Sequence, residues 1–173
     1  MESFRLLIGG SPSKMFHLKE FSDNLIDLGI ECKVVLDVDY CDGFPSRKIS
    51  KWIYKKNKLP NLISKYKPDM VLVDRQRHFG LEVIKTRIPL LVHLRGDFWK
   101  EIEMAKKTIY KSIPKKIVIN EWEKIGEKCF QESTIILPIC NYLSNIVKNR
   151  IKIKKFKQCI KESIQKTGLK PKE

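Results

Sequence analysis

The stretch from residue 67 to residue 97 reads KPDMVLVDRQRHFGLEVIKTRIPLLVHLRGD. It contains two short apolar runs, Met70–Val73 and Pro89–Val92, and each leads directly into acidic and basic residues. Near-continuous apolar runs joined by a segment of helical character are typical of parallel strands that are buried on both faces of a sheet. Ligands of such sheets bind just beyond the carboxyl ends of the strands, where these charged residues fall. The stretch therefore predicts a parallel sheet and a ligand site at one edge of it.

The same pattern of strands and helices extends over the rest of the chain. Five strands are predicted: Phe4–Ile8, Cys32–Leu36, Met70–Asp74, Leu90–Leu94 and Thr134–Leu137. Ser11 and Pro12 form a favourable helix start, apolar residues follow at helical spacing, and Gly29 is placed to end that helix. Other helices are predicted over residues 80–86, 98–111, 116–132 and 141–148, with a polar loop over 37–46 and then a basic helical region broken near Pro60. This alternation predicts a three-layer, Rossmann-like α/β sandwich with a mostly parallel sheet of about five strands.

The length and composition limit the domain count and the cellular environment. A chain of 173 residues fits one domain with a real core, predicted over residues 1–148, followed by a basic tail over 149–173 that is helical or disordered. No apolar run approaches the roughly 20 residues that cross a bilayer, and the first residues do not resemble a signal peptide. The five cysteines are widely spaced and form no C-x-x-C pair, which favours reduced thiols in a cytoplasmic protein.

The positive charge is unevenly distributed along the chain. The formal net charge is +15, and the segment from Lys148 to the end carries a net +8 of it. The segment Arg47–Lys67 has eight basic residues and no acidic one, with Trp52 and Tyr54 interleaved. A basic stretch with aromatic residues can bind an anionic membrane surface or a nucleic acid. The alternative is a solvated helical face, because charge alone does not choose a partner.

The turn Gly9-Gly10-Ser11 follows the first predicted strand and is a candidate phosphate-binding element. Glycines let a ligand approach the backbone closely, and the free amides at a helix start favour an anion. The turn lacks the remaining residues of a Walker A loop and of a G-x-G-x-x-G fingerprint. A purely structural turn therefore stands as the alternative.

His93, Arg95 and Asp97 form a second candidate cluster, to which we assign the catalytic role. Alternate residues of a strand share a face, so His93 and Arg95 are expected to project together, with Asp97 just beyond them. A histidine exchanges protons near neutral pH, and an arginine suits phosphate or carboxylate groups. The alternative is that His93 is a packed core residue and that Asp97 is only a helix cap.

Arg75, Arg77 and His78 follow the third predicted strand and are candidates for lining the same crevice. Their alternative is an exposed loop, because surface charges are usually solvated. Residues 37–39 spell D-x-D, a metal-binding motif in some glycosyltransferases, but the short motif is interpreted as coincidence, and no metal or cofactor is predicted. Trp99 and Trp122 lie on predicted helices and are expected to be packing residues.

Four stretches resemble the glycosyltransferase family 4-like amino-terminal domain, which is the amino-terminal half of a GT-B glycosyltransferase. They are LLIGG at residues 6–10 with the helix that follows it, KPDMVLV at 67–73, IPLLVHLRGD at 88–97 and IILPICNYL at 135–143. Together they cover about residues 4–148 in the family's order. The resemblance implies two Rossmann-like domains facing each other across a cleft, with the acceptor held mainly by the amino-terminal one. It places Gly10 near the donor diphosphate and the end of the fourth strand near the sugar. Where the family usually has a histidine directly before a glycine, this sequence has Arg95, with His93 two residues earlier.

The resemblance implies transfer of a sugar from a nucleotide sugar to a glycan or lipid-linked acceptor, on the inner face of a membrane. After Lys148 no second nucleotide-binding unit can be placed, so the chain alone is expected to be inactive or very weakly active. It is interpreted either as one subunit of a split enzyme, completed by a separate donor-domain protein, or as a truncated remnant. The alternative function is a non-catalytic Rossmann-like module whose basic surface binds an anionic membrane or a nucleic acid, of which the nucleic acid is not favoured. A nicotinamide-dependent oxidoreductase is disfavoured because the glycine fingerprint is incomplete.

Overall fold

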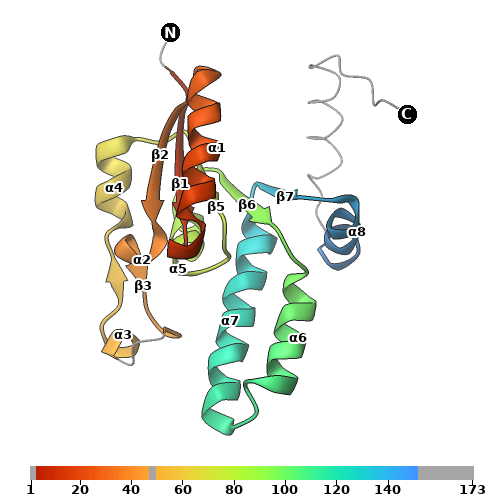
Figure 1. Ribbon diagram of the computed structural model, residues 1–173. Helices are drawn as coiled ribbons and strands as arrows, with labels where there is room; N and C mark the ends of the chain where they lie inside the picture. Colours follow the sequence, from red (N-terminus) through yellow and green to blue (C-terminus); the bar gives the residue numbers. More distant parts are fainter. Residues whose placement is uncertain (1–2, 47–49, 152–173) are drawn as a thin grey trace.

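The computed structural model describes residues 3–46 and 50–151, and its centre is a five-stranded sheet (Figure 1). The strands are β1 (Arg5–Gly10), β2 (Glu31–Leu36), β5 (Met70–Val73), β6 (Leu90–Leu94) and β7 (Ile135–Pro138). They are ordered β2-β1-β5-β6-β7, and every neighbouring pair is parallel. Helices flank this sheet, which confirms the predicted Rossmann-like sandwich. The strand order reverses between β1 and β5, which is where open α/β sheets bind their ligands.

The connections between strands are mostly helical. The helices are α1 (Met15–Asp27) after a short 3-10 turn η1 (Pro12–Lys14), α2 (Asp37–Tyr40), α3 (Ser50–Ile53), α4 (Leu59–Tyr66), α5 (His78–Ile84), α6 (Phe98–Thr108), α7 (Ile113–Glu132) and α8 (Asn141–Arg150). A small antiparallel pair joins β3 (Cys41–Asp42) to β4 (Lys56–Asn57). The predicted polar loop over residues 37–46 is therefore wrong in part, because it contains α2 and β3. The predicted starts of α5 at residue 80 and of α7 at residue 116 were also late.

Each face of the sheet has its own apolar core. On one face Leu6, Ile8 and Leu72 pack against Leu18 of α1. The other face carries the larger core, which includes Phe79 of α5 and continues into α7 and α8. Successive residues of a strand alternate between faces, so β6 buries Leu90, Val92 and Leu94 in the larger core and turns Leu91 and His93 toward the α1 side. The alternation therefore places the imidazole ring of His93 near the end of a strand whose other residues are apolar.

Helices α6 and α7 form an antiparallel hairpin that projects past the carboxyl ends of the strands (Figure 1). Its base is held by aromatic packing, in which Trp99 stacks on Phe130 with ring centroids 5.1 Å apart and Phe98 meets both rings edge-on. Gly126 lies directly against Phe98, and a Cβ added to it would lie 2.2 Å from the Phe98 ring. The predicted packing role of Trp99 is confirmed, and the hairpin is fixed firmly at its sheet end.

The carboxyl-terminal part of the chain is described only as far as α8. The predicted basic tail begins within this helix, and residues 152–173 lie outside the described residues, as do residues 47–49 of the basic stretch. Among the helices of the described ranges, none is both long and apolar enough to cross a membrane.

Candidate functional site

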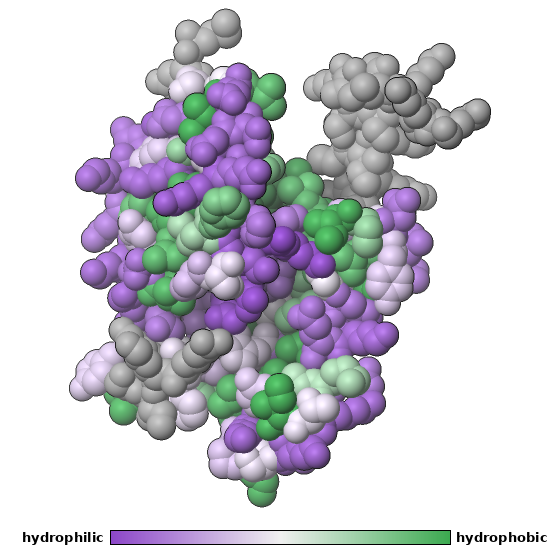
Figure 2. All heavy atoms as spheres, in the orientation of Figure 1, coloured by the Kyte–Doolittle hydropathy of each residue, from purple (hydrophilic) through white to green (hydrophobic). Residues whose placement is uncertain are grey.

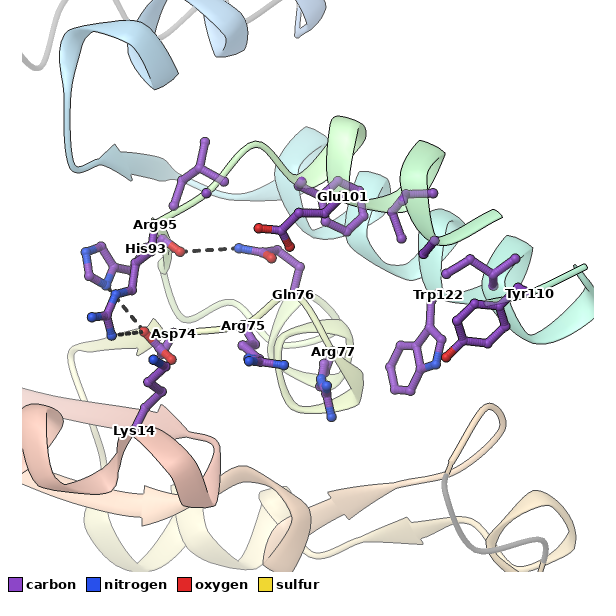
Figure 3. A pocket seen from close by; sticks show the side chains of 16 residues that line it. Lys14, Asp74, Arg75, Gln76, Arg77, His93, Arg95, Glu101, Tyr110 and Trp122 are labelled. Atoms are coloured by element: carbon purple, nitrogen blue, oxygen red, sulfur yellow. Dashed lines mark hydrogen bonds and ion pairs between the residues drawn. The ribbon is translucent and has the colours of Figure 1, made fainter. Parts of the chain in front are cut away.

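Two adjoining cavities lie between the carboxyl edge of the sheet and the α6–α7 hairpin, and Figure 3 shows the side chains that line one of them. Their volumes are about 530 and 680 Å³, and they share Arg75, Arg77, Tyr110 and Trp122 as lining residues. Hydrophilic side chains dominate the middle of the face shown in Figure 2. Because the shared residues join them, we describe the two cavities as one crevice and call them its first and second cavities. The crevice lies at the edge of the sheet that the sequence predicted.

Asp74 is the centre of the charged cluster in the first cavity. It follows β5 directly, and its amide donates a hydrogen bond of 3.1 Å to the carbonyl of Gly9. Its carboxylate is 1% exposed, with Oδ1 3.4 Å from Arg95 Nη1 and 3.5 Å from His93 Nδ1. The strand register accounts for this meeting, because Val73 pairs with Val92 and the next residues, Asp74 and His93, are then neighbours.

The charge state of Asp74 follows from two opposing effects. Burial by itself raises the pKa of its carboxyl group, but the hydrogen bond from His93 and the positive charge of Arg95 outweigh burial and lower the pKa below the ordinary value. Asp74 is therefore ionised at neutral pH and can only accept hydrogen bonds. Where His93 Nδ1 meets this carboxylate it must carry a proton, since an ionised carboxylate only accepts, and Nε2 is the nitrogen left for other partners.

The segment 75–77 crosses the floor of the crevice. Gln76 Nε2 donates a hydrogen bond of 3.3 Å to the carbonyl of His93, which ties this segment to the end of β6. Arg75 is exposed and lines both cavities. Arg77 lies over the ring of Trp122, with 4.9 Å between its guanidinium carbon and the ring centroid. Arg75 and Arg77 are therefore brought to one site by the same short segment, and Arg95 reaches it from the end of β6 (Figure 3).

His78 begins α5 and is buried rather than part of an exposed loop. Its Nε2 lies 3.3 Å from the carbonyl oxygen of Pro45, and its ring centroid is 5.5 Å from that of Trp122. Burial lowers the pKa of His78, and nearby hydrogen bonds and Asp42 offset this only in part. The ring is neutral at pH 7 and lines the second cavity, where it supports Trp122.

The glycine turn lies beside the crevice, and only its serine lines a cavity. A Cβ on Gly9 would lie 2.7 Å from the Phe79 ring, and one on Gly10 would lie 2.0 Å from Leu18 Cδ1. Both glycines thus permit close packing of helices against β1, as the structural alternative proposed. Ser11 is buried and lines the second cavity.

Asp97 lies apart from His93 and Arg95 and caps α6. Its Oδ1 accepts a hydrogen bond of 3.0 Å from the Lys100 amide, and its Oδ2 lies 3.5 Å from the Tyr142 hydroxyl. The residue lines neither cavity of the crevice. The structure brings His93 and Arg95 together and leaves Asp97 in the position of the alternative interpretation, a helix cap.

The acidic residues of the D-x-D motif line the second cavity. Asp37 is buried at the start of α2, and burial raises the pKa of its carboxyl group despite a hydrogen bond from the Val38 amide and the charges of Arg77 and Arg75. Asp39 is exposed. Within residues 3–46 and 50–151, no three acidic, histidine or cysteine side chains gather closely enough to hold a metal ion.

Several lining residues were missed by the sequence reasoning. Lys14 reaches the first cavity from η1, Glu101 from α6, and Tyr110 and Trp122 from the hairpin (Figure 3). Trp122 was expected to be a packing residue only. Its position beside the crevice depends on the length and direction of the hairpin, for which the local sequence carries no signal. Asp74 did have a signal, because it is the first polar residue after a buried strand.

A third cavity of about 340 Å³ lies on the α1 side of His93 and Arg95. Phe21 of α1 and Leu137 and Ile139 at the end of β7 give it an apolar lining, and all three are exposed. His93 and Arg95 therefore form a polar ridge between the charged crevice and an apolar groove.

Comparison with known proteins adds no family to this description. No protein-family model matches the sequence, and no curated protein matches it. The fold and the site therefore define the chain as a Rossmann-like α/β protein with a charged crevice at its topological switch point.

Proposed function

We propose that this chain is the acceptor-side half of a GT-B-type glycosyltransferase, which transfers a sugar from a nucleotide sugar to a glycan or lipid-linked acceptor. The observation that carries the proposal is the position of the first cavity of the crevice, in whose lining cationic side chains outnumber acidic ones. Lys14, Arg75 and Arg95 line one cavity at the point where the strand order reverses. Cationic side chains at such a point suit the phosphates of a nucleotide sugar.

The Asp74–His93 pair is suited to the acceptor hydroxyl. An ionised carboxylate that accepts from Nδ1 fixes the orientation of the ring and stabilises it when it takes up a proton. Nε2 is then able to accept the proton that a sugar hydroxyl loses as it attacks the donor sugar. Arg95, which shares the same carboxylate, is placed to stabilise the negative charge that develops on the departing phosphate.

The other end of the crevice is suited to the ring of a sugar. Trp122 and Tyr110 line both cavities, and Arg77 lies over one face of the Trp122 ring. Aromatic residues offer a large apolar surface with a polar edge, which suits the alternating apolar and hydroxyl faces of a sugar. The groups that complete the donor site are proposed to come from a separate donor domain.

Ligand titration with the 173-residue chain tests the proposal. Uridine and guanosine diphosphate sugars are titrated by calorimetry, with inorganic diphosphate as a simpler probe. Binding is expected to weaken about tenfold in Arg75→Ala or Arg95→Ala, because each removes a charged hydrogen bond to phosphate. Arg87→Ala is the matched control, since Arg87 is exposed and lines none of the three cavities.

Two results would contradict the proposal. If no nucleotide sugar binds, or if Arg87→Ala weakens binding as much as the crevice variants, the crevice is not a phosphate site. Sugar transfer by the purified chain, measured with a radiolabelled donor and no added protein, would show that the chain is more than half of an enzyme.

A further inference from the structure

The tip of the α6–α7 hairpin, defined as residues 104–120, is a strongly basic surface. It contains five lysines and no acidic residue. Lys106 and Lys107 are paired with glutamates that lie outside the tip. Lys111, Lys115 and Lys116 are all exposed. These exposed lysines of the tip suit an anionic partner.

The same tip exposes large apolar side chains. Ile113 is 77% exposed, and Ile109 and Ile117 are also more than half exposed. Ile113 and Ile117 are one helical turn apart on α7, so they share a face of that helix. Figure 2 shows hydrophobic side chains among hydrophilic ones at this lowest projection of the molecule. Isoleucines grouped on an exposed projection indicate a surface that contacts another apolar phase.

A second projection with exposed apolar side chains lies on the same side of the molecule. Figure 1 places α3 and the turn between α6 and α7 beyond the carboxyl ends of the strands. Ile53 and Tyr54, at the end of α3, are both at least three-quarters exposed. The lysines that follow them bind groups within the protein, because Lys55 pairs with Glu82 and Lys56 donates a hydrogen bond to the Val38 carbonyl. Trp52 anchors this projection, because its Nε1 donates a hydrogen bond of 2.8 Å to the Ser46 carbonyl.

The second cavity lies between the two projections. Asp42, Ser46 and Lys56 line it from the side of α3, and Tyr110, Val118 and Trp122 line it from the side of the hairpin. A flat surface that touches both projections would therefore face the crevice.

We propose that the hairpin tip and the end of α3 dock together on an anionic lipid bilayer. The isoleucines enter the boundary between headgroups and acyl chains, and the lysines contact the lipid phosphates, as in other interfacial segments. A nucleic acid would leave the isoleucines exposed, since they neither stack on bases nor form hydrogen bonds, and the membrane is therefore favoured. This membrane contact does not depend on the proposed function. Only one consequence of it rests on that function, namely that a lipid-linked acceptor reaches the crevice from the membrane.

Vesicle flotation with the full chain tests the contact without any sugar ligand. Phosphatidylcholine vesicles are compared with vesicles that also contain phosphatidylserine, and binding is expected only to the latter. Lys115→Ala/Lys116→Ala is expected to weaken partitioning about 25-fold, at about fivefold per lysine. Ile113→Ser/Ile117→Ser keeps the charge and is expected to weaken it about tenfold.

The matched control is Lys65→Ala/Lys128→Ala, which removes the same charge from the ends of α4 and α7 that lead into the sheet. It is expected to partition nearly as the unmodified chain does, and circular dichroism verifies that every variant is folded. Equal partitioning of the isoleucine variant and the unmodified chain would overturn the proposal. An equal loss of partitioning in the control variant would also overturn it. So would a result in which the tip lysines are needed for binding to duplex RNA but not for binding to vesicles.

Discussion

Replacing Asp74 by asparagine keeps the size of the side chain and removes the charge that holds His93 and Arg95 at the end of β6. The carboxylate is 1% exposed, and both partners lie 3.4–3.5 Å from the same oxygen. Both partners retain access to water, so the cost is smaller than for a pair that is buried throughout. We expect Asp74→Asn to lower the free energy of unfolding at pH 7 by about 2 kcal/mol.

This loss depends on pH because the fold lowers the pKa of Asp74. Burial opposes the shift, and the hydrogen bond from His93 and the charge of Arg95 more than compensate for it. A carboxyl group with a lowered pKa stabilises the fold above its unfolded pKa and loses that contribution as the pH falls through its folded pKa. The stability difference between the unmodified chain and the variant is therefore full at neutral pH and shrinks below about pH 4.

Urea unfolding followed by tryptophan fluorescence measures this difference at neutral pH and again near pH 3. Asp23→Asn is the control, because Asp23 is an exposed aspartate of α1. The control is expected to change stability by less than about 0.5 kcal/mol. Equal stability of Asp74→Asn and the unmodified chain at neutral pH would refute the argument, and so would a difference that persists unchanged near pH 3.

Two further predictions concern buried positions of the fold. Gly10→Ala would place a Cβ 2.0 Å from Leu18 Cδ1, so we expect a loss of about 1–3 kcal/mol in chemical unfolding; an unchanged midpoint would contradict the close packing. Burial raises the pKa of Cys129 to about 12, and iodoacetamide is therefore expected to spare it in the native protein while modifying the exposed Cys140. Peptide mass mapping distinguishes the two cysteines, and rapid native labelling of Cys129 would show that the region opens.

The sequence was sufficient to predict the sheet and the edge at which the crevice lies. Each strand of the five-stranded sheet was found within a few residues, because buried parallel strands leave continuous apolar runs and the turns between them are rich in glycine and proline. The short strands β3 and β4 were missed. Alternation along β6 likewise predicted that His93 and Arg95 share a face. The positions of the strands and the face on which a strand residue lies depend on neighbours along the chain. The local sequence pattern is therefore sufficient to predict them.

Other features depend on contacts between distant segments. The pairing of Asp74 with His93 requires the register between β5 and β6, which no local pattern specifies. Asp97 is two residues past Arg95, where extended backbone would keep it on the same face, but the chain turns into α6 and uses it as a cap. Trp122 reaches the crevice only because of the direction of a long helix.

The contact between Gly126 and Phe98 has a consequence for the width of the crevice. Because the two helices of the hairpin approach each other at a residue without a side chain, any larger residue there would push them apart near their base. Tyr110 and Trp122 are carried on that hairpin, and a small rotation at the base would become a larger displacement at the crevice. Gly126 itself lines neither cavity, but its neighbour Phe98 lines the first one, so this one position sets the width of the opening.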